Sequence, residues 1–518
     1  MNGDQIGQLV TQAALQCPDR AAITSPQGYR LTYAELDERS TRLANALLAS
    51  GCTPGDRVGA WLDTCPQYVE LYFAVAKAGL VLVPVNSMFT LDEADYQVDH
   101  AQVRVLFSGS AVAQLAPVLV ERYGLTHVEV GEWSEPADAP YEQLVASGSD
   151  VLPPLPDEDD LYLIAYTSGT TGRPKGAMVT HRTLMATLRQ HAHSYRTPKH
   201  SVLGYHSNMS FVATVLGLVM GHAYLAGTVV LLGRVQPAEF LDLLESEGCT
   251  FTFVPSPWIV PMTELARQHP EKWQQVRTFV HSASKANPED LQRWAAVVGH
   301  RFLEGLGMSE NSGGLITVTD VDDVVAGSAA QDMYASVGRP VVGTAMRVVD
   351  VEGNDLPRDG VSIGELVVQS PSLVVGYWRN PAATAAALRD GWYFTGDLGA
   401  IDPAGYVYVS ERRNDLIVSG GMNVYPSEIE RCVAALPGVV EVAVVGVPHP
   451  RWGQTPVAVV VADPARGLTQ DDVVEHCRGL LASYKKPSRV VFVDELPRSA
   501  SNKVLKRVLR EQLAPVPA

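Results

Sequence analysis

Apolar segments of helical and strand-like spacing alternate through the first part of the chain. Residues 32–35, Thr-Tyr-Ala-Glu, form a capping box, and apolar positions follow at helical spacing. The apolar run 57–62 is typical of a strand, and residues 67–78 and 80–85 repeat the order of helix and strand. This alternation predicts helices packed on a mainly parallel sheet.

The last hundred or so residues have an alternation of their own. Residues 439–447, 456–461 and 490–493 are apolar runs typical of strands. Residues 471–481 follow a helical pattern, and a further helix is expected after Lys503. The sequence therefore predicts a separate, small α+β domain at the C-terminal end.

Residues 211–233 form the one stretch whose apolar character suggests a membrane span, since it carries no charge apart from a possible one on His222. Glycine residues interrupt it, Gly217 and Gly221 among them, and residues 228–232 have the pattern of a separate strand. We expect a buried helix, a turn and a buried strand here rather than a membrane span.

The composition narrows the class of protein. With 518 residues, 46% hydrophobic and 19% charged, the chain is expected to form a soluble protein of two or more domains. Its net charge of −17 argues against a general binder of nucleic acid or membrane surfaces. The six cysteines lack metal-ligand spacing, so free thiols are expected, and residues 1–10 do not resemble a signal peptide. These features favour a cytoplasmic location.

A loop rich in glycine and hydroxyl groups follows the strand-like run 161–167. Close backbone approach at its glycines, its hydroxyl donors and one lysine together describe a cradle for phosphate groups. The P-loop pattern does not fit, because Lys175 follows a proline and precedes a glycine, and no helix start follows it. The residues that carry this interpretation are Ser168, Gly169, Thr170, Thr171, Gly172, Lys175 and Gly176.

This loop closely resembles the phosphate loop of the adenylate-forming superfamily, which includes acyl-CoA synthetases, aryl-CoA ligases and amino-acid adenylation domains. The resemblance spans the full chain and is best matched by the acyl-CoA synthetase branch. It implies an α/β fold with a large N-terminal domain of mainly parallel sheets, a β-barrel-like subdomain, and a small mobile α+β C-terminal domain. The implied domains are residues 1–413 and 415–518, with a hinge at Asn414.

The resemblance also implies the nucleotide site. Ser309 and Glu310 match the hydroxyl and the magnesium-binding carboxylate of the family, and Asp397 and Arg412 match its two ribose contacts. Lys503 matches its catalytic lysine. The remaining residues implied to contact ATP or AMP are Thr167, Ser168, Gly169, Thr170, Thr171, Gly172, Lys175, Ala283, Ser284, Lys285, Glu304, Gly305 and Leu306.

The acyl and CoA sites follow from the same resemblance. His206 occupies the place of the family's gate residue, and Phe211, Gly313 and Gly314 are implied to line the acyl pocket. Amino-acid adenylation domains carry an aspartate where this chain has Phe211, so a neutral or acidic organic acid is favoured over an amino acid. The small residues Ala213 and Gly217 near His206, together with the run Asn311-Ser-Gly-Gly314, suggest a roomy pocket. The CoA tunnel is implied at Gly420, Gly421 and Met422.

Three departures from the family pattern all lie at positions implied to contact the nucleotide or to adjoin the catalytic lysine. Residues 282–285, Ser-Ala-Ser-Lys, replace the usual glycine-rich adenine wall, Leu306 replaces a stacking tyrosine, and Asn502 replaces the glycine before the catalytic lysine. Losing an aromatic stacking face could cost about 1–3 kcal/mol of nucleotide binding. We therefore consider a variant that adenylates weakly and acts mainly in thioester formation.

The implied reaction joins a small-molecule carboxylic acid to CoA through an acyl-adenylate, with ATP, Mg²⁺ and CoA as reactants and ions and no redox cofactor. No nucleic-acid partner and no membrane span are expected, and a homodimer stays open. Alternatives are a free-standing adenylation enzyme with another acceptor, a luciferase-like oxygenase and a non-enzymatic ligand-binding relative.

Overall fold

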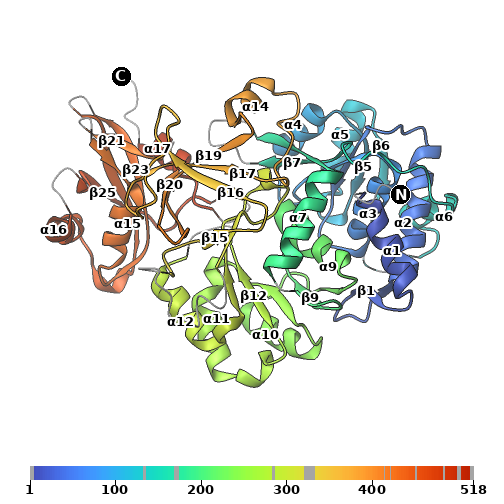
Figure 1. Ribbon diagram of the computed structural model, residues 1–518, viewed down its shortest axis with the longest axis horizontal. Helices are drawn as coiled ribbons and strands as arrows, with labels where there is room; N and C mark the ends of the chain where they lie inside the picture. The colour runs from blue at the N-terminus through green and yellow to red at the C-terminus, as the bar shows by residue number, and fades with distance from the viewer. Residues whose placement is uncertain are drawn as a thin grey trace. The chain divides into compact units, whose positions relative to one another are not determined.

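The computed structural model describes residues 5–131, 133, 136–167, 174–195, 197–282, 286–319, 333–412, 415–419, 422–449, 452–481, 485–498 and 503–513 (Figure 1). Contacts divide the chain into two compact units. The first comprises residues 1–346, 368–393 and 404–406, and the second comprises residues 347–367, 394–403 and 407–518. The expected hinge residue, Asn414, lies outside the described residues, so the boundary at that position stays a prediction.

Two sheets of mainly parallel strands form the first unit, as the alternation of helix and strand predicted. Within the described residues, one has the order β13-β12-β11-β9-β10-β1-β2, and only the β1–β2 pair in it is antiparallel. Its strands are β1 (Ala21–Thr24), β2 (Arg30–Thr32), β9 (Val202–Tyr205), β10 (Thr228–Leu231), β11 (Phe251–Phe253), β12 (Thr278–His281) and β13 (Phe302–Glu304).

The second sheet has the order β6-β5-β3-β4-β7-β8, and among its described strands only β7 and β8 pair antiparallel. Its strands are β3 (Arg57–Trp61), β4 (Val81–Pro84), β5 (Val103–Ser108), β6 (Thr126–Glu129), β7 (Leu161–Thr167) and β8 (Lys175–Thr180). The hairpin β7–β8 therefore carries the expected phosphate loop at its tip.

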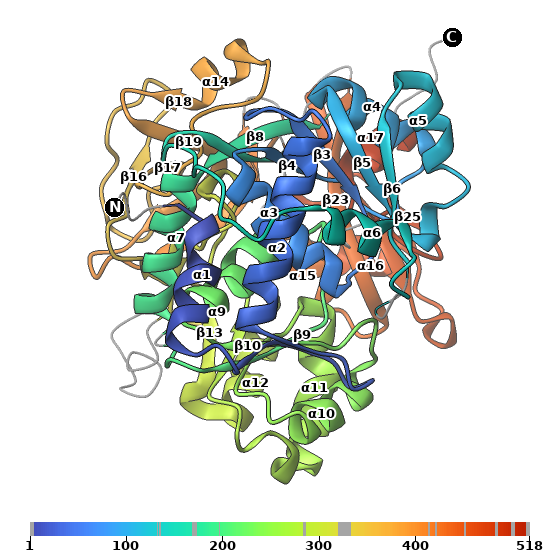
Figure 2. The ribbon, with the colours of Figure 1, turned by 90° about the vertical axis from the view of Figure 1, so that its right-hand side faces the viewer.

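Helices cover both sheets, and α1, α2 and α3 lie side by side (Figures 1 and 2). The helices of this unit are α1 (Gly7–Gln16), α2 (Tyr33–Ala49), α3 (Pro66–Ala78), α4 (Leu91–Ala101), α5 (Ala116–Tyr123), α6 (Pro140–Ser147), α7 (His181–Ser194), α8 (Val212–Thr214), α9 (Met220–Tyr224), α10 (Pro237–Ser246), α11 (Ile259–Gln268), α12 (Pro288–Val298) and α14 (Pro381–Ala387).

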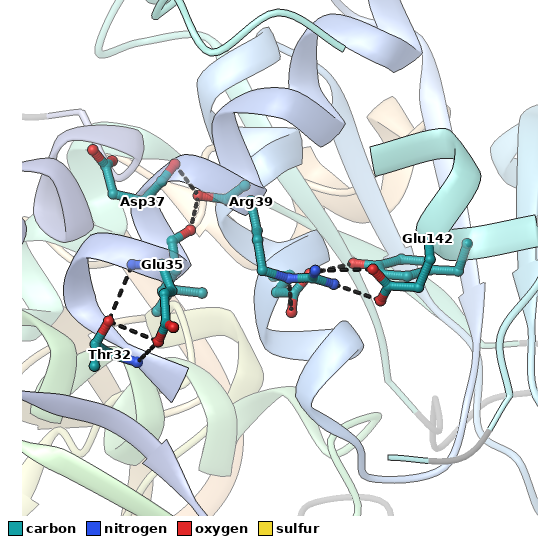
Figure 3. A network of polar contacts seen from close by, with 9 residues as sticks. Thr32, Glu35, Asp37, Arg39 and Glu142 are labelled. Atoms are coloured by element: carbon teal, nitrogen blue, oxygen red, sulfur yellow. Dashed lines mark hydrogen bonds and ion pairs between the residues drawn. The ribbon is translucent and has the colours of Figure 1, made fainter. Parts of the chain in front are cut away.

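Helix α2 begins at the expected capping box. The Thr32 hydroxyl accepts from the Glu35 amide, and the Glu35 carboxylate accepts from the Thr32 amide at 2.7 Å (Figure 3). One turn further on, Arg39 binds Glu142 of α6 through both terminal nitrogens, and its Nε lies 2.9 Å from the buried carboxylate of Glu70 on α3. Because Arg39 binds it, the Glu70 carboxylate on the fully buried helix α3 is not left unpaired.

A further sheet has the order β16-β17-β19-β18, and β20 also pairs with β19. The β-barrel-like form expected of a subdomain stays a prediction. The division between the two units passes through these strands. The strands are β16 (Ala345–Val349), β17 (Gly364–Gln369), β18 (Leu388–Arg389), β19 (Trp392–Ile401) and β20 (Val407–Arg412), and a small pair is formed by β14 (Thr317–Val318) and β15 (Arg339–Pro340).

The C-terminal part of the second unit is an α+β fold whose described strands follow the order β22-β21-β24-β23, with β25 beside β24. Its elements are β21 (Ile417–Ser419), β22 (Met422–Val424), α15 (Pro426–Ala434), β23 (Val439–His449), β24 (Gly453–Ala462), α16 (Gln470–Leu480), β25 (Arg489–Phe492) and α17 (Lys506–Leu513). The strands and helices expected after residue 439 are all present.

The apolar stretch 211–233 folds as predicted. It forms α8, a π-helical segment at Val215–Val219, α9, a turn and the buried strand β10. No helix in the described part of the chain is long and apolar enough to cross a membrane. The six cysteines are free thiols, as expected from their spacing.

Three buried histidines predict sensitivity to acid. Burial lowers the pKa of His181, His191 and His222 to about 4, from 6.5. Between these values the unfolded chain binds more protons than the folded one, so the free energy of unfolding should fall as pH drops from 6.5 towards 4. The loss approaches about 1.4 kcal/mol per pH unit for each histidine. Urea midpoints followed by tryptophan fluorescence at pH 7 and pH 5 measure it. His222→Gln should flatten the slope; an unchanged slope would contradict the assignment.

Candidate active site

The hairpin β7–β8 positions the base of the phosphate loop. Thr167 and Lys175 are paired in register across the hairpin. Helix α4 holds this base from outside, because the Tyr96 hydroxyl donates to the Pro174 carbonyl at 2.9 Å and His100 Nδ1 lies 2.7 Å from the Tyr166 hydroxyl. The tip itself lies outside the described residues, so the roles of Ser168, Gly169, Thr170, Thr171 and Gly172 stay predictions.

Tyr377 connects the two charged residues expected to handle the ATP phosphates. The Lys175 ammonium lies 5.2 Å from the centre of the Tyr377 ring, over its face. The Tyr377 hydroxyl donates to Glu310 Oε1 at 3.1 Å and lies 2.9 Å from the hydroxyl of Tyr393. A cation and a carboxylate separated by 135 positions in the sequence thus share one aromatic side chain.

Glu310 lies in a short 3-10 turn, Ser309–Asn311, and its carbonyl accepts from the Val374 amide at 2.9 Å. Its side chain is partly exposed, so the carboxylate can reach a ligand while it accepts from Tyr377. Magnesium in nucleotide sites usually takes one or two carboxylates together with substrate phosphates, so a single carboxylate here fits the ion. Among the described residues, no group of three acidic, histidine or cysteine side chains could hold a metal ion.

The segment expected to contact adenine begins at the end of β13. Glu304 is 5% exposed, Gly305 is also buried, and Leu306 is partly exposed. The Leu306 amide donates to the Thr317 hydroxyl at 3.2 Å, and the Leu306 carbonyl accepts from the Ile316 amide at 2.8 Å. These bonds fix the backbone around Leu306. Ala283, Ser284 and Lys285 of the expected adenine wall lie outside the described residues.

His206, the expected gate residue, lies in an aromatic cluster. Its ring stacks on Trp258 with centroids 4.6 Å apart and meets the edge of Phe240 at 4.8 Å. Its Nε2–H donates to the Phe253 carbonyl at 2.8 Å. Burial lowers the pKa of His206, so the ring is neutral at physiological pH and its orientation is fixed by these contacts.

The small residues of the expected acyl pocket are used for close packing. A side-chain Cβ at Gly313, where φ is +74°, would lie 2.9 Å from the Ala213 Cα, and one at Gly217 would lie 2.7 Å from the His191 ring. A Cβ at Gly314 would lie 2.9 Å from a methyl carbon of Thr187. The glycines therefore let the helical segment after Phe211 approach the loop 311–314, and their small size does not by itself indicate a roomy pocket. The roles of Phe211, Gly313 and Gly314 as pocket residues stay predictions.

The second unit carries the expected ribose contacts. Asp397 in β19 is 7% exposed and is paired in register with Arg412 at the end of β20. Its amide donates to the Thr395 hydroxyl at 3.0 Å, and the amide of Gly396, whose φ is +72°, donates to Glu365 Oε1 at 3.1 Å. The backbone turn before Asp397 is thus held by two side chains.

Lys503 extends from a loop whose ends are tied together. Arg498 and Val504 form an antiparallel bridge, and the Leu505 amide donates to the Pro497 carbonyl at 2.8 Å. Lys503 itself is exposed. Met422, expected at the CoA tunnel, is 48% exposed at the start of β22, whereas Gly420, Gly421 and Asn414 lie outside the described residues.

A comparison with known protein families shows to which family the chain belongs. The family described as AMP-binding enzyme matches residues 10–378, and the AMP-binding enzyme C-terminal domain matches residues 428–503. The chain belongs to the AMP-binding enzyme family.

Individual relatives are similar to this chain over almost its whole length. A feruloyl-CoA synthase of Amycolatopsis sp is 34% identical over 99% of this chain and 100% of its own. The fatty acid–[acyl-carrier-protein] ligase ScoC of Streptomyces coeruleorubidus is 33% identical over 94% of this chain and 92% of its own. The crystal structure of ATP-bound MatB from Rhodopseudomonas palustris matches with a TM-score of 0.90 and 32% identity, covering 99% of both chains. This AMP-binding enzyme is an adenylate-forming ligase of the acyl-CoA synthetase branch, as the resemblance predicted.

Sequence reasoning did not assign roles to Tyr377, Tyr96 or His100. Tyr377 stands between Gly376 and Trp378, and nothing in this local sequence connects it to Lys175 or Glu310. The only signal in the sequence was general: a buried tyrosine hydroxyl usually finds a hydrogen-bond partner.

Proposed function

We propose that this enzyme activates an organic carboxylic acid with ATP and transfers the acyl group to the thiol of CoA. A carboxylate oxygen bonds to the α-phosphorus of ATP, and the bond from that phosphorus to the β-phosphate oxygen breaks, which gives an acyl-adenylate and pyrophosphate. The CoA sulfur then bonds to the acyl carbon and AMP leaves. The thiol proton is released to solvent.

The contact of Lys175 and Glu310 with Tyr377 is the observation that best supports the first step. Both steps concentrate negative charge, and preorganised charged groups are an effective way to stabilise it. Lys175 would bind the β- and γ-phosphates together with the loop amides of residues 168–172. Ser309 would offer a hydroxyl, and Asp397 and Arg412 would hold the ribose. Lys503 would lie between the carboxylate and the α-phosphate.

Glu310 would hold Mg²⁺, and the ion would supply charge neutralisation at the phosphates when bound. Tyr377 donates to one oxygen of this carboxylate, which leaves lone pairs on both oxygens available for a metal ion. The hydrogen bond would orient Glu310 before the metal–nucleotide complex arrives.

The second step requires Lys503 to leave the reaction centre, because a thiol must approach where the lysine stood. We propose that Asn414 is the pivot of this change, since hinge residues lie at the ends of elements and absorb a change in φ and ψ. Gly420, Gly421 and Met422 would then line the path of the thiol.

Two features of the proposed reaction have alternatives: the thiol that accepts the acyl group, and the relative rates of adenylation and thioester formation. The similarity to ScoC, a fatty acid–[acyl-carrier-protein] ligase, favours a carrier-protein thiol as the second candidate. The replacements at residues 282–285, Leu306 and Asn502 favour a variant with weak adenylation as the third. The acid is proposed to be neutral or acidic, because Phe211 stands where an amino-acid substrate would need a carboxylate.

Pyrophosphate release and CoA consumption, measured in one reaction, test the proposal. A panel of aliphatic, aromatic and polycyclic acids should include one that gives pyrophosphate and consumes CoA in equal amounts. Pyrophosphate without CoA consumption would indicate another acceptor. CoA consumption from supplied acyl-adenylate with little pyrophosphate from any acid would indicate the weak-adenylation variant.

Substitution of Tyr377 should separate its two contacts. Tyr377→Phe keeps the ring beneath Lys175 but removes the hydroxyl on Glu310, so the Mg²⁺ concentration for half-maximal adenylation should rise about threefold to tenfold, the worth of one hydrogen bond. Tyr377→Leu also removes the ring, so the KM for ATP should rise as well. Tyr393→Phe, which removes only the neighbouring hydroxyl, is the control. Identical Mg²⁺ and ATP dependence in the Phe and Leu variants would refute this division of roles.

A further inference from the structure

Three polar side chains, of which His281 and Glu304 are buried and Ser256 is partly exposed, form a chain of contacts at one edge of the seven-stranded sheet. Ser256 Oγ lies 2.9 Å from His281 Nε2, and His281 Nδ1 bonds to the Glu304 carboxylate. His281 and Glu304 are the last residues of β12 and β13, and Ser256 follows the end of β11. These strands are parallel neighbours, so their carboxyl ends meet at the same edge.

The contact between His281 and Glu304 is enclosed. His281 exposes none of its surface and Glu304 exposes 5%. Backbone bonds run beside it, because the Gly305 amide donates to the His281 carbonyl at 3.2 Å and the Glu304 amide donates to the Thr319 hydroxyl at 2.8 Å. A buried carboxylate is costly unless it is paired, so His281 and Glu304 depend on each other.

Two segments expected to contact adenine begin where these side chains lie. The wall at residues 282–285 continues directly from His281, and Leu306 follows Glu304 by two residues. The His281–Glu304 contact links the two strand ends, and it fixes the position of Gly305 and Leu306 relative to the end of β12.

The order serine, histidine, carboxylate is also that of a nucleophile relay. In such a relay, the imidazole takes the serine proton and delivers it to the leaving group, which it must therefore reach. His281 has no exposed surface, so it cannot approach a leaving group. The burial favours a positioning role over a nucleophilic one.

We infer that Ser256, His281 and Glu304 are positioning residues that set the nucleotide-binding edge of the sheet. The inference rests on the proposed function and goes beyond it in assigning Ser256 and His281, which are not among the residues implied to contact the nucleotide. Ser256 holds His281 from the turn that follows β11, and His281 in turn orients Glu304 and the backbone of Gly305.

Ser256→Ala tests the inference with least risk to folding, because it leaves the buried His281–Glu304 pair in place. The dissociation constant for ATP, measured by calorimetry, and the KM for ATP should both rise about threefold to tenfold, the effect of one lost hydrogen bond. The KM for the acid and for CoA should not change. Ser256→Thr should restore ATP binding.

Thr252→Val is the matched control. Thr252 lies on β11, the strand that precedes Ser256, and its buried hydroxyl donates to the Gly204 carbonyl at 2.9 Å. Its loss should lower the melting temperature but leave ATP binding unchanged. Glu304→Gln, which keeps an acceptor for His281 but removes the charge, should weaken ATP binding in the same direction as Ser256→Ala.

An unchanged ATP dissociation constant in Ser256→Ala would overturn the inference, as would equal rises in the KM for ATP and for the acid. If the native protein binds ATP and releases pyrophosphate while Ser256→Ala matches it, the inference alone is wrong. If the native protein binds no ATP and releases no pyrophosphate with any acid, both the inference and the proposed function are wrong.

Discussion

Lys503→Ala should reduce acyl-adenylate formation by about 100-fold or more while thioester formation from supplied acyl-adenylate is nearly unchanged. The magnitude is that of removing one preorganised group that stabilises developing charge. Because the Lys503 side chain is exposed, its truncation opens no cavity in the core and should not affect folding. Single-turnover adenylation and the isolated second step, each at saturating substrate, measure the two effects.

Arg507→Ala is the control for this experiment. Arg507 lies four residues further on, is exposed, and pairs with Glu511 within the same helix, so it loses the same charge from the same region. An exposed pair of this kind contributes about 0–1 kcal/mol, and both half-reactions should proceed at nearly native rates. Equal losses in both half-reactions for Lys503→Ala would contradict its assignment to the first step.

Glu310→Gln should reduce adenylation by about 100-fold and raise the Mg²⁺ concentration needed for half-maximal rate. The amide keeps the volume and can accept from Tyr377, but it removes the charge expected to hold the metal ion. Adenylation rates over a series of Mg²⁺ concentrations separate the loss of metal binding from a loss of turnover.

Glu289→Gln serves as the control for charge, since Glu289 is exposed in the first turn of α12. Its rate and Mg²⁺ dependence should be native. If Glu310→Gln shows native Mg²⁺ dependence, Glu310 does not hold the ion, whatever the change in rate.

Local signals were sufficient for much of the fold. The capping box at Thr32 and Glu35 is made by residues three positions apart, so its geometry depends only on the helix that it begins. The helix and the strand within residues 211–233 were predicted correctly because glycines interrupt an apolar run and a β-branched run favours a strand, and both effects act locally. The strands on each side of the phosphate loop were likewise recognisable from apolar runs interrupted by glycines.

The contacts that connect the candidate site were not readable from the sequence. Tyr377 meets Glu310 across 67 positions, and Ser256 meets His281 across 25, so both contacts exist only once the strands are ordered. The small size of Gly217 and Gly313 suggested open space, whereas the structure fills that space with the His191 ring and the backbone of Ala213. A small residue allows either a cavity or a close approach, and only tertiary packing decides between them.

The most direct test of the proposed chemistry follows an oxygen atom. A substrate acid labelled with ¹⁸O in its carboxylate should be incubated with the enzyme, ATP, Mg²⁺ and CoA, and the phosphorus products analysed by mass spectrometry. If the carboxylate attacks the α-phosphorus, one ¹⁸O atom appears in AMP and none in pyrophosphate. Label in inorganic phosphate, or formation of ADP in place of AMP, would contradict the acyl-adenylate mechanism.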